Sequence, residues 1–374
     1  MKTLKDKKIL ISGASFAGLS TAYWMNTLGY EVTVVEIAGG LKMGGTPVNI
    51  EGDTVAVVKR MGLFEQIRSS RLVMELLEFK NGDDVTEGSV MLKKDEEEQH
   101  DDECEIERNT LLNMLFNAVK KDVEFLFSNS ITALNETTDN MEVTFKDGSQ
   151  RAFDLVFGCD GIHSVVRKIW FGNEAEYLHF LNQYFSITIV NKLLLKQNTT
   201  QFYNVPDKGV MLNGYNNKTD IIFCFRSEKE IPYDYRDEAQ QKAIILQQFK
   251  GQGWRTGELL KEVMSAETFY FDKLCQVKMP SWTRGRVALV GDAGYCASPA
   301  AGKGGSLALD GAAALADAFQ LHGGDYESAF RDYNKNLRPY IEEVQANVIT
   351  MGLDVLVPRT EEAIRKRNKE GFGF

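Results

Sequence analysis

The first forty residues alternate between apolar runs and a helical pattern. Residues 8–12 (KILIS) are a short apolar run without polar alternation, which is typical of a strand buried on both faces of a parallel sheet. Residues 17–28 then carry apolar side chains at helical spacing, and Gly29 marks the helix end. Residues 31–36 (EVTVVE) resemble a second strand. The pattern predicts a βαβ unit of about thirty residues and an α/β fold.

The pattern changes along the rest of the chain. Residues 140–158 predict a hairpin and then a buried strand. Residues 178–278 alternate as strands, interrupted by one polar helix, which predicts an antiparallel sheet in a separate lobe. A strand within GRVALVGDA marks the return to α/β character. Helices are predicted at 62–70, 108–120, 238–252, 305–321, 325–352 and from 359 onward.

Composition narrows the class of protein. The 374 residues are 43% hydrophobic and 26% charged, as in an ordinary globular protein. A net charge of −10 disfavours a nucleic-acid partner, and no apolar run approaches the ~20 residues of a membrane span. The five cysteines include no CxxC pair and fit the reducing cytoplasm. Because the four histidines are scattered as well, no metal site is predicted. The charge-rich residues 93–105 are expected to form an exposed loop.

The turn after the first strand has the shape of a nucleotide-binding site. Gly13 permits a tight turn, Gly18 permits close helix–strand packing, and Ser15 replaces the usual middle glycine while offering a hydroxyl donor. With Phe16 and Ala17, these residues open a helix whose unpaired amides attract a pyrophosphate. Glu36 ends the second strand, where a carboxylate accepts hydrogen bonds from an adenosine ribose. FAD and NAD both satisfy this segment.

Two distant motifs place further carboxylates at strand ends. Asp160 follows a buried strand in LVFGCDGIHSVVR, and Asp292 follows another in RVALVGDAGYCASPAAGKGGS. An ionised aspartate there can accept hydrogen bonds from a polyol, although either residue alone could equally be a helix cap. The glycines after Pro299 open a long helix, whose dipole can stabilise an anion such as a reduced flavin.

Taken in order, these motifs resemble the FAD-dependent monooxygenases of the para-hydroxybenzoate hydroxylase type, and most closely their tetracycline-inactivating branch. The carrying elements are GxSxxG with Glu36, Arg108 in EIERNTL, DGxxSxxR, GDA, and Pro299 with GxGG. Tyr295 and Lys303 replace residues common in the family. The resemblance implies that FAD is bound by Gly13, Ser15, Phe16, Ala17, Gly18, Glu36, Lys42, Arg108, Asp160, Asp292, Pro299, Gly302, Gly304 and Gly305.

The same resemblance implies a domain division. A discontinuous Rossmann-like FAD-binding domain would span residues 1–177 and 279–324, and the antiparallel sheet of residues 178–278 would be an inserted substrate-binding domain. Residues 325–374 would form a C-terminal helical segment. A monomer is compatible with this organisation.

The implied reaction consumes NAD(P)H and molecular oxygen. A flavin C4a-hydroperoxide would transfer one oxygen atom to an aromatic or polyketide-like small molecule, with tetracycline-like antibiotics among the candidates, in a pocket that excludes water. Met211 and Asn213 share a strand face and, with Phe223 and Pro299, are the predicted substrate wall. Phe202 and Phe225 are further aromatic candidates, and no catalytic acid or base is assigned. An FAD-dependent reductase of the prenyl-reductase type is the alternative.

Overall fold

A six-stranded sheet forms the centre of the first lobe in the computed structural model, which describes residues 7–92 and 102–371. Its order is β18 (Thr283–Arg284), β19 (Val287–Leu289), β12 (Leu155–Gly158), β1 (Lys8–Ser12), β2 (Glu31–Glu36) and β8 (Glu124–Phe127). The pairs from β19 to β8 are parallel, and β18 runs antiparallel to β19. The predicted βαβ unit is therefore the middle of this sheet.

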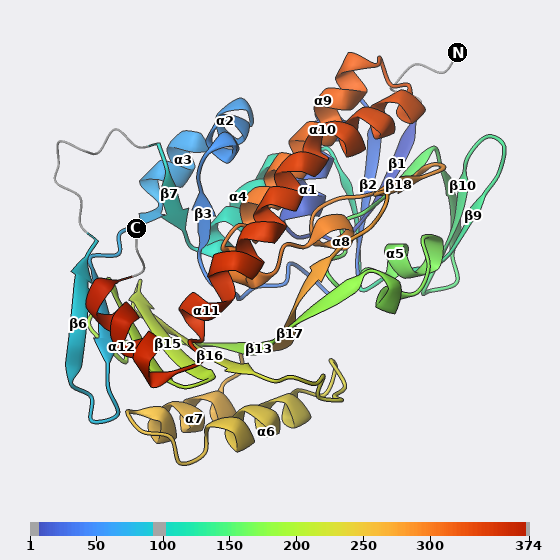
Figure 1. Cartoon of the computed structure of the whole chain (residues 1–374). Helices are drawn as coiled ribbons and strands as arrows, with labels where there is room; N and C mark the ends of the chain where they lie inside the picture. The colour runs from blue at the N-terminus through green and yellow to red at the C-terminus, as the bar shows by residue number, and fades with distance from the viewer. Residues whose placement is uncertain (1–6, 93–101, 372–374) are drawn as a thin grey trace.

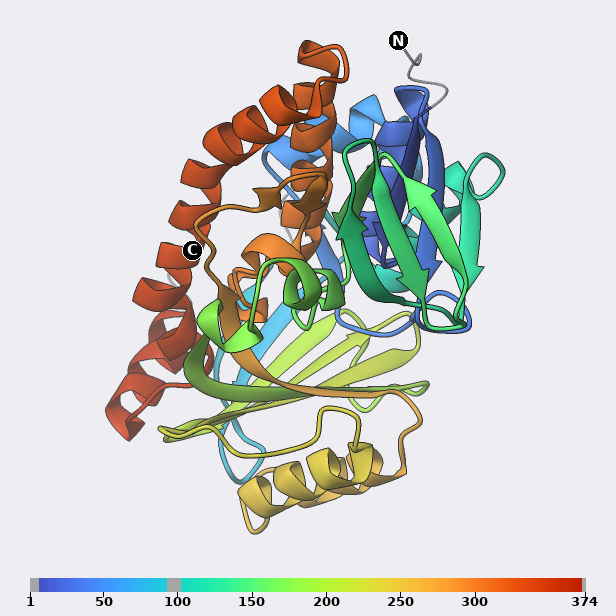
Figure 2. The same ribbon diagram turned by 90° about the vertical axis from the view of Figure 1, so that its right-hand side faces the viewer.

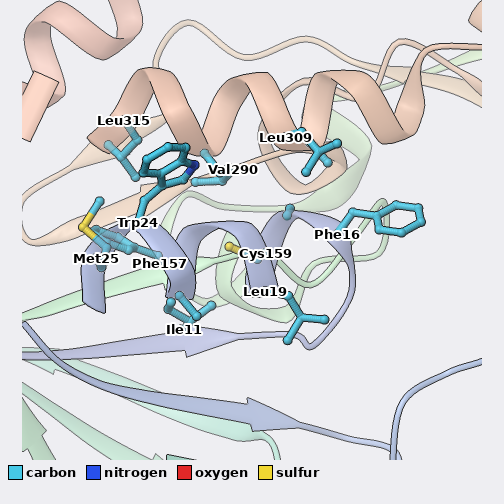
Figure 3. Close-up of a cluster of buried hydrophobic side chains, with 14 of the residues drawn as sticks. Ile11, Phe16, Leu19, Trp24, Met25, Phe157, Cys159, Val290, Leu309 and Leu315 are labelled. Atoms are coloured by element: carbon cyan, nitrogen blue, oxygen red, sulfur yellow. The ribbon is translucent and has the colours of Figure 1, made fainter. Parts of the chain in front are cut away.

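Three helices lie on one face of the sheet and enclose the main core. Helix α1 (Phe16–Thr27) packs on α9 (Gly304–Leu321), and α10 (Tyr326–Asn347) lies against α9. Figure 3 shows Ile11 of β1, Leu19 of α1 and Leu309 of α9 in this core, all fully buried. Because side chains surround α1, its apolar residues do not form a single stripe.

A small antiparallel sheet covers the opposite side of the first lobe (Figure 2). It has the order β11 (Gln150–Phe153), β10 (Met141–Phe145) and β9 (Ile131–Glu136). The hairpin predicted for residues 140–158 is its β10–β11 pair, which turns at Gly148 with φ +84°. β12 then enters the central sheet as the predicted buried strand.

A seven-stranded sheet forms the second lobe (Figure 1). Its order is β17 (Phe269–Val277), β13 (Leu178–Val190), β16 (Lys218–Arg226), β15 (Lys208–Tyr215), β14 (Thr199–Val205), β5 (Leu76–Lys80) and β6 (Thr86–Met91). Helices α6 (Glu238–Phe249) and α7 (Thr256–Ser265) pack on one face, where Tyr184, Phe223 and Phe249 are buried. The opposite face is turned toward the first lobe.

The second lobe extends beyond residues 178–278. β5 pairs in parallel with β14, and β6 pairs with β5, so two strands from residues 76–91 complete the sheet. Helix α12 (Glu361–Glu370) contacts β6 and β14. Sequence patterning could not show this, because strand pairing between segments more than a hundred residues apart leaves no local signal.

The predicted helices are present with shifted ends. Helices α3 (Phe64–Ser69) and α4 (Arg108–Val119) lie at the two early positions, and α10 continues into a π-helical turn, Val348–Gly352. The unpredicted elements include β3 (Val48–Ile50), α2 (Asp53–Arg60), β4 (Arg71–Leu72), β7 (Cys104–Ile106), α8 (Asp292–Tyr295) and α11 (Leu353–Leu356). Helix α5 (Val165–Trp170) lies where a helical turn is expected after Asp160. Residues 93–101 of the charge-rich stretch lie outside the described ranges. Among the helices described, none is both long and apolar enough to cross a bilayer.

Candidate active site

The turn between β1 and α1 tolerates no side chain at its two outer glycines. Gly13 has φ +103°, and a Cβ there would lie 2.5 Å from the Cys159 carbonyl oxygen. A Cβ on Gly18 would lie 1.8 Å from the Gly13 carbonyl oxygen. Ser15 is the N-cap residue of α1, and its side chain makes no capping hydrogen bond, so the hydroxyl is available to other partners.

Glu36 folds back onto this turn. One carboxylate oxygen accepts a hydrogen bond from the Ala14 amide at 2.8 Å, and the other accepts one from the Ala38 amide at 2.9 Å. The carboxylate is thereby held at the carboxyl end of β2, beside the start of α1. This is the position from which a carboxylate can accept hydrogen bonds from a ribose.

Arg108 ties the same turn to the loop after β2. Its guanidinium donates to the Gly44 carbonyl at 2.9 Å, to the Lys42 carbonyl at 3.1 Å and to the Ser15 hydroxyl at 3.1 Å. It also lies 5.0 Å from the centre of the Phe16 ring. Burial lowers the pKa of Arg108, and the charges of Asp292 and Tyr270 oppose that change.

Asp160 accepts hydrogen bonds from the first amides of the short helix α5, whose N-cap residue is Ser164. The carboxylate accepts from the Val165 amide at 2.8 Å, from the Val166 amide at 3.1 Å and from the Ser164 hydroxyl. Burial raises the pKa of Asp160, and these donors oppose that rise. The helix-cap alternative therefore describes Asp160 well, although the residue also lies directly behind Gly13.

Asp292 lies at the start of α8, beside the first turn of α1. Gly291 has φ +69°, and a Cβ there would lie 2.9 Å from the Ala17 Cβ. Burial raises the pKa of Asp292, while a hydrogen bond from Cys296 and the charges of Arg108 and Arg167 oppose the rise. The charges of these two guanidinium groups therefore favour the ionised form of the Asp292 carboxyl.

Arg167 joins the last two motifs. Its guanidinium is fully buried and donates to the Ala293 carbonyl at 2.8 Å and to the Ile162 carbonyl. The segments around residues 13–18, 158–167 and 291–293 therefore meet at one edge of the central sheet, as the ordered motifs predict.

The glycine-rich loop before α9 has two different surfaces. A Cβ on Gly302 or Gly304 would meet no heavy atom within 4 Å, so both residues border open space. A Cβ on Gly305 would lie 2.2 Å from Val48 Cγ1, so the absence of a side chain at Gly305 is required by packing against β3. Lys303 points to Glu51, with 2.6 Å between Nζ and Oε1. Tyr295 is a core residue, because its ring is buried and its hydroxyl bonds to that of Tyr333.

A mostly apolar cavity of about 140 Å³ lies between this loop and the large sheet. Met211 and Pro299, both predicted as substrate residues, line it. The other lining residues are Thr46, Phe185, Ile187, Phe202, Gly209, Val210, Ile222, Cys224, Leu274, Ala300 and Leu356. Asn213, also predicted for the substrate wall, is not among the lining residues; it shares the face of Met211, and its side-chain oxygen accepts a hydrogen bond from the Thr200 hydroxyl at 2.9 Å.

Phe223 does not line the cavity, contrary to the sequence prediction. It is buried in the cluster under α6 and α7, and its ring lies 4.7 Å from that of Phe249 on the helix-covered face. Met211 pairs instead with Ile222, so Ile222 and Cys224 are the residues of β16 that reach the cavity. Successive residues of a strand point to opposite faces of the sheet, so a prediction that is wrong by one position selects a side chain on the wrong face. Phe225 is also buried on the helix side, whereas Phe202 reaches the cavity.

Residues 6–347 match the family model described as FAD binding domain, and the chain belongs to this family. A flavin-dependent monooxygenase from an unknown prokaryotic organism is 34% identical over 375 residues, covering 98% of this chain and 96% of that protein. A flavin-dependent monooxygenase of Legionella longbeachae is 35% identical over 347 residues, covering 91% and 87%.

A solved structure agrees with these relatives. The crystal structure of tetracycline destructase Tet(51) superposes with a TM-score of 0.87 at 32% identity, covering 97% of this chain and 94% of that one. The chain is therefore an FAD-dependent monooxygenase, and the resemblance to the tetracycline-inactivating branch is confirmed.

The described residues fit an FAD molecule. Open space over Gly302 and Gly304 leaves room for a flat ring system against the loop before α9. The Asp292 carboxylate, half-buried beside the first turn of α1, is a suitable acceptor for polyol hydroxyls. In the part of the chain that the structure describes, no group of three His, Cys, Asp or Glu side chains is arranged to hold a metal ion.

Proposed function

We propose that this FAD-dependent monooxygenase consumes NAD(P)H and inserts one oxygen atom of O2 into an aromatic or polyketide-like small molecule, with tetracycline-like antibiotics among its candidate substrates. The proposal is supported by the contact between the cavity and the glycine-rich loop before α9, hereafter the cofactor loop. Pro299 and Ala300, which precede the open glycines, form part of the cavity wall. A substrate in the cavity would therefore lie next to the surface that fits the flavin ring.

Different residues of the chain would bind different parts of the FAD molecule. The α1 amides and Ser15 would bind the pyrophosphate, Glu36 the adenosine ribose, and Asp292 the ribityl chain. Arg108 would fix the loop of residues 42–45 over the first turn, and Lys42 would add positive charge there. Asp160 would act mainly by shaping the turn behind Gly13. FAD, when bound, supplies the redox and oxygen-activating chemistry that no side chain can supply.

The cavity wall would exclude water and orient the substrate. Phe185, Ile187 and Leu274 make one side apolar, which limits the access of water to the reacting centre. A volume of about 140 Å³ is close to that of an engineered cavity of roughly 150 Å³ that takes up benzene. One ring of a larger substrate would occupy the cavity, and the remainder would extend along the cofactor loop.

Reaction stoichiometry tests the proposal. Purified protein with added FAD would be screened against phenols, naphthols and tetracyclines for stimulated NADPH and NADH oxidation, with oxygen uptake followed in parallel. We expect a product heavier by one oxygen atom, labelled when ¹⁸O2 is used. Substrate reduction without uptake of labelled oxygen would favour the reductase alternative, and a protein that acquires no flavin spectrum would contradict the proposal.

A further inference from the structure

A groove lies between the two helices that cover the outer face of the large sheet. Helices α6 and α7 lie side by side, on the side of this sheet away from the first lobe (Figures 1 and 2). The groove has a volume of about 560 Å³ and is lined by residues of both helices and of the turn between them. It shares no lining residue with the cavity beside the cofactor loop, so it is a separate feature of the molecule.

The groove has an apolar lining contributed by both helices. Leu246 comes from α6, whereas Leu260 and Met264 come from one face of α7, because they are four positions apart in a helix. Leu260 is buried in the core under the helices, whereas Leu246 and Met264 remain 39% and 46% exposed. An apolar ligand in the groove would cover these two exposed side chains, which favours its binding.

A glycine keeps the groove open near the start of α7. Gly257 lies in the first turn of this helix, although glycine is a poor helix former. A Cβ on Gly257 would meet no heavy atom within 4 Å, so packing against neighbouring residues does not require glycine there. The missing side chain instead leaves space in the groove that Gly257 lines.

Two lysines without ionic partners border the same apolar lining. Lys250 follows the last residue of α6, Lys261 belongs to α7, and both are exposed and line the groove. Neither forms an ion pair with a residue that the structure describes. The acidic residues of the two helices are held by other cations, in the pairs Glu238–Lys242, Glu258–Arg255 and Glu262–Lys192.

This combination of charge and apolar surface defines the chemistry of a ligand. The whole chain carries a net charge of −10, so two unpaired ammonium groups beside an apolar groove are a local exception. They complement a ligand that has an anionic head and an apolar chain. A volume of about 560 Å³ lies within the range of small-molecule sites, roughly 300–1,000 Å³. Two lysines are fewer than the clusters of about 4–8 basic residues that bind anionic membranes, which favours a free molecule.

We propose that the groove between α6 and α7 binds a free, single-chain amphiphile with an anionic head, of the fatty carboxylate class. Its chain would lie over Leu260, between Leu246 and Met264, and its head would be held by Lys250 and Lys261. The inference goes beyond the proposed function and does not depend on it, because the groove and the cavity lie on opposite sides of the large sheet.

The test compares decanoate with decyltrimethylammonium, which has the same chain length and the opposite charge. Dissociation constants would be measured by isothermal titration calorimetry on FAD-loaded protein. We expect one decanoate per chain, bound at least tenfold more tightly than the cation, although the net charge of −10 would favour the cation at a non-specific site. Lys250→Gln and Lys261→Gln should each weaken decanoate binding about fivefold, as for one exposed ion pair.

Two further variants separate the groove from other sites. Gly257→Leu should abolish decanoate binding by filling the groove, while the circular dichroism spectrum stays that of the wild type. Lys121→Gln is the matched control, because Lys121 is exposed in the first lobe, and it should keep the wild-type affinity. Decanoate binding that is insensitive to all three groove variants would overturn the inference, since the ligand would then lie elsewhere.

The wild type alone also decides the matter. Equal affinity for decanoate and decyltrimethylammonium, or no binding of either, would overturn the inference even if the variants fail to fold. Sedimentation with phosphatidylglycerol vesicles distinguishes a free ligand from a membrane surface, and we expect the protein to remain in the supernatant. Lysine-dependent sedimentation without decanoate binding would overturn the inference in favour of membrane docking.

Discussion

The Arg108 guanidinium donates a hydrogen bond to the Ser15 hydroxyl at 3.1 Å, joining the start of α4 to the turn that opens α1. Ser15 occupies the position of the family's middle glycine, and its side chain makes no capping bond. The contact explains why serine is compatible with this turn, since the extra atoms have a partner. It also makes Arg108 a structural part of the predicted FAD site.

Arg108→Ala should weaken FAD binding by on the order of ten- to a hundredfold, because it removes charge-assisted hydrogen bonds to the turn and to the loop of residues 42–45. Titration of apoprotein with FAD, followed by flavin fluorescence, measures the change. Arg68→Ala is the control, since Arg68 is exposed on α3 and pairs with Glu65. Equal FAD affinities of the wild type and Arg108→Ala would show that Arg108 does not contribute to the FAD site.

Gly13→Ala should lower the thermal midpoint of unfolding more than Gly148→Ala does. Both glycines have positive φ, which costs an alanine roughly 1–2 kcal/mol. Only at Gly13 would the new Cβ meet backbone, whereas Gly148 has open space around it. The difference between the two midpoints, measured by circular dichroism, isolates the steric clash, and similar midpoints would contradict this account.

Gly304→Ala should separate stability from cofactor binding. The residue begins α9 and borders open space, so alanine should leave the free energy of unfolding unchanged or raise it by up to about 1 kcal/mol. The same methyl group would protrude where the flavin ring is expected, and FAD affinity should fall. Urea unfolding and FAD titration on one preparation measure the stability and the FAD affinity. An unchanged FAD affinity would show that the flavin ring does not lie against Gly304.

Met211→Ala should chiefly change substrate binding, whereas Phe223→Ala should chiefly reduce stability. Phe223 is fully buried against Phe249, so its truncation should reduce the free energy of unfolding by about 3–5 kcal/mol. Met211 is only half-buried and lines the cavity, so its truncation should chiefly change the substrate KM. Urea unfolding and steady-state kinetics measure the two effects. The reverse pattern would contradict the register of β15 and β16.

Because of His163, the free energy of unfolding should decrease as the pH becomes alkaline. Burial alone would lower its pKa, but the bonds to Asp272 and Glu174 outweigh that effect and raise the pKa from 6.5 to about 9. Because the folded state holds the proton more tightly, this contribution is complete below about pH 6.5 and disappears as the pH rises through about 9. The nearby charged groups are Asp272, Glu174 and Arg167, and Tyr235 stacks on the ring.

Urea unfolding between pH 6 and pH 10 measures this effect. His163→Gln should flatten the decline relative to the wild type, while His179→Gln, a change at an exposed position on β13, should not. A decline of the same size in all three proteins would assign it to other groups.

Local patterns were sufficient for the β1–α1–β2 unit, because its strand, turn and helix signals lie within thirty residues. The order of the motifs also predicted that Ser15, Arg108 and Asp292 come together, and the structure brings them to one sheet edge. Asp160 and Asp292 look alike in sequence, yet only Asp160 has a following run of amides to cap. That distinction depends on backbone geometry rather than on residue type.

The misassignment of Phe223 has a different origin. Alternation identifies which residues of one strand share a face, but only pairing with β15 shows which face that is. The contact of His163 with Asp272 was equally inaccessible, since 109 positions separate the two residues.

The entry of β5 and β6 into the large sheet limits how this architecture can be recombined. A gene fragment for residues 178–278 would leave the β14 edge without its neighbour, exposing unpaired amides and carbonyls that invite aggregation. Transplanting the substrate-recognition half into a homologous scaffold would therefore require exchanging two separated stretches together. Divergence of specificity in such a chain should proceed by point substitutions on the sheet more readily than by shuffling of a whole module.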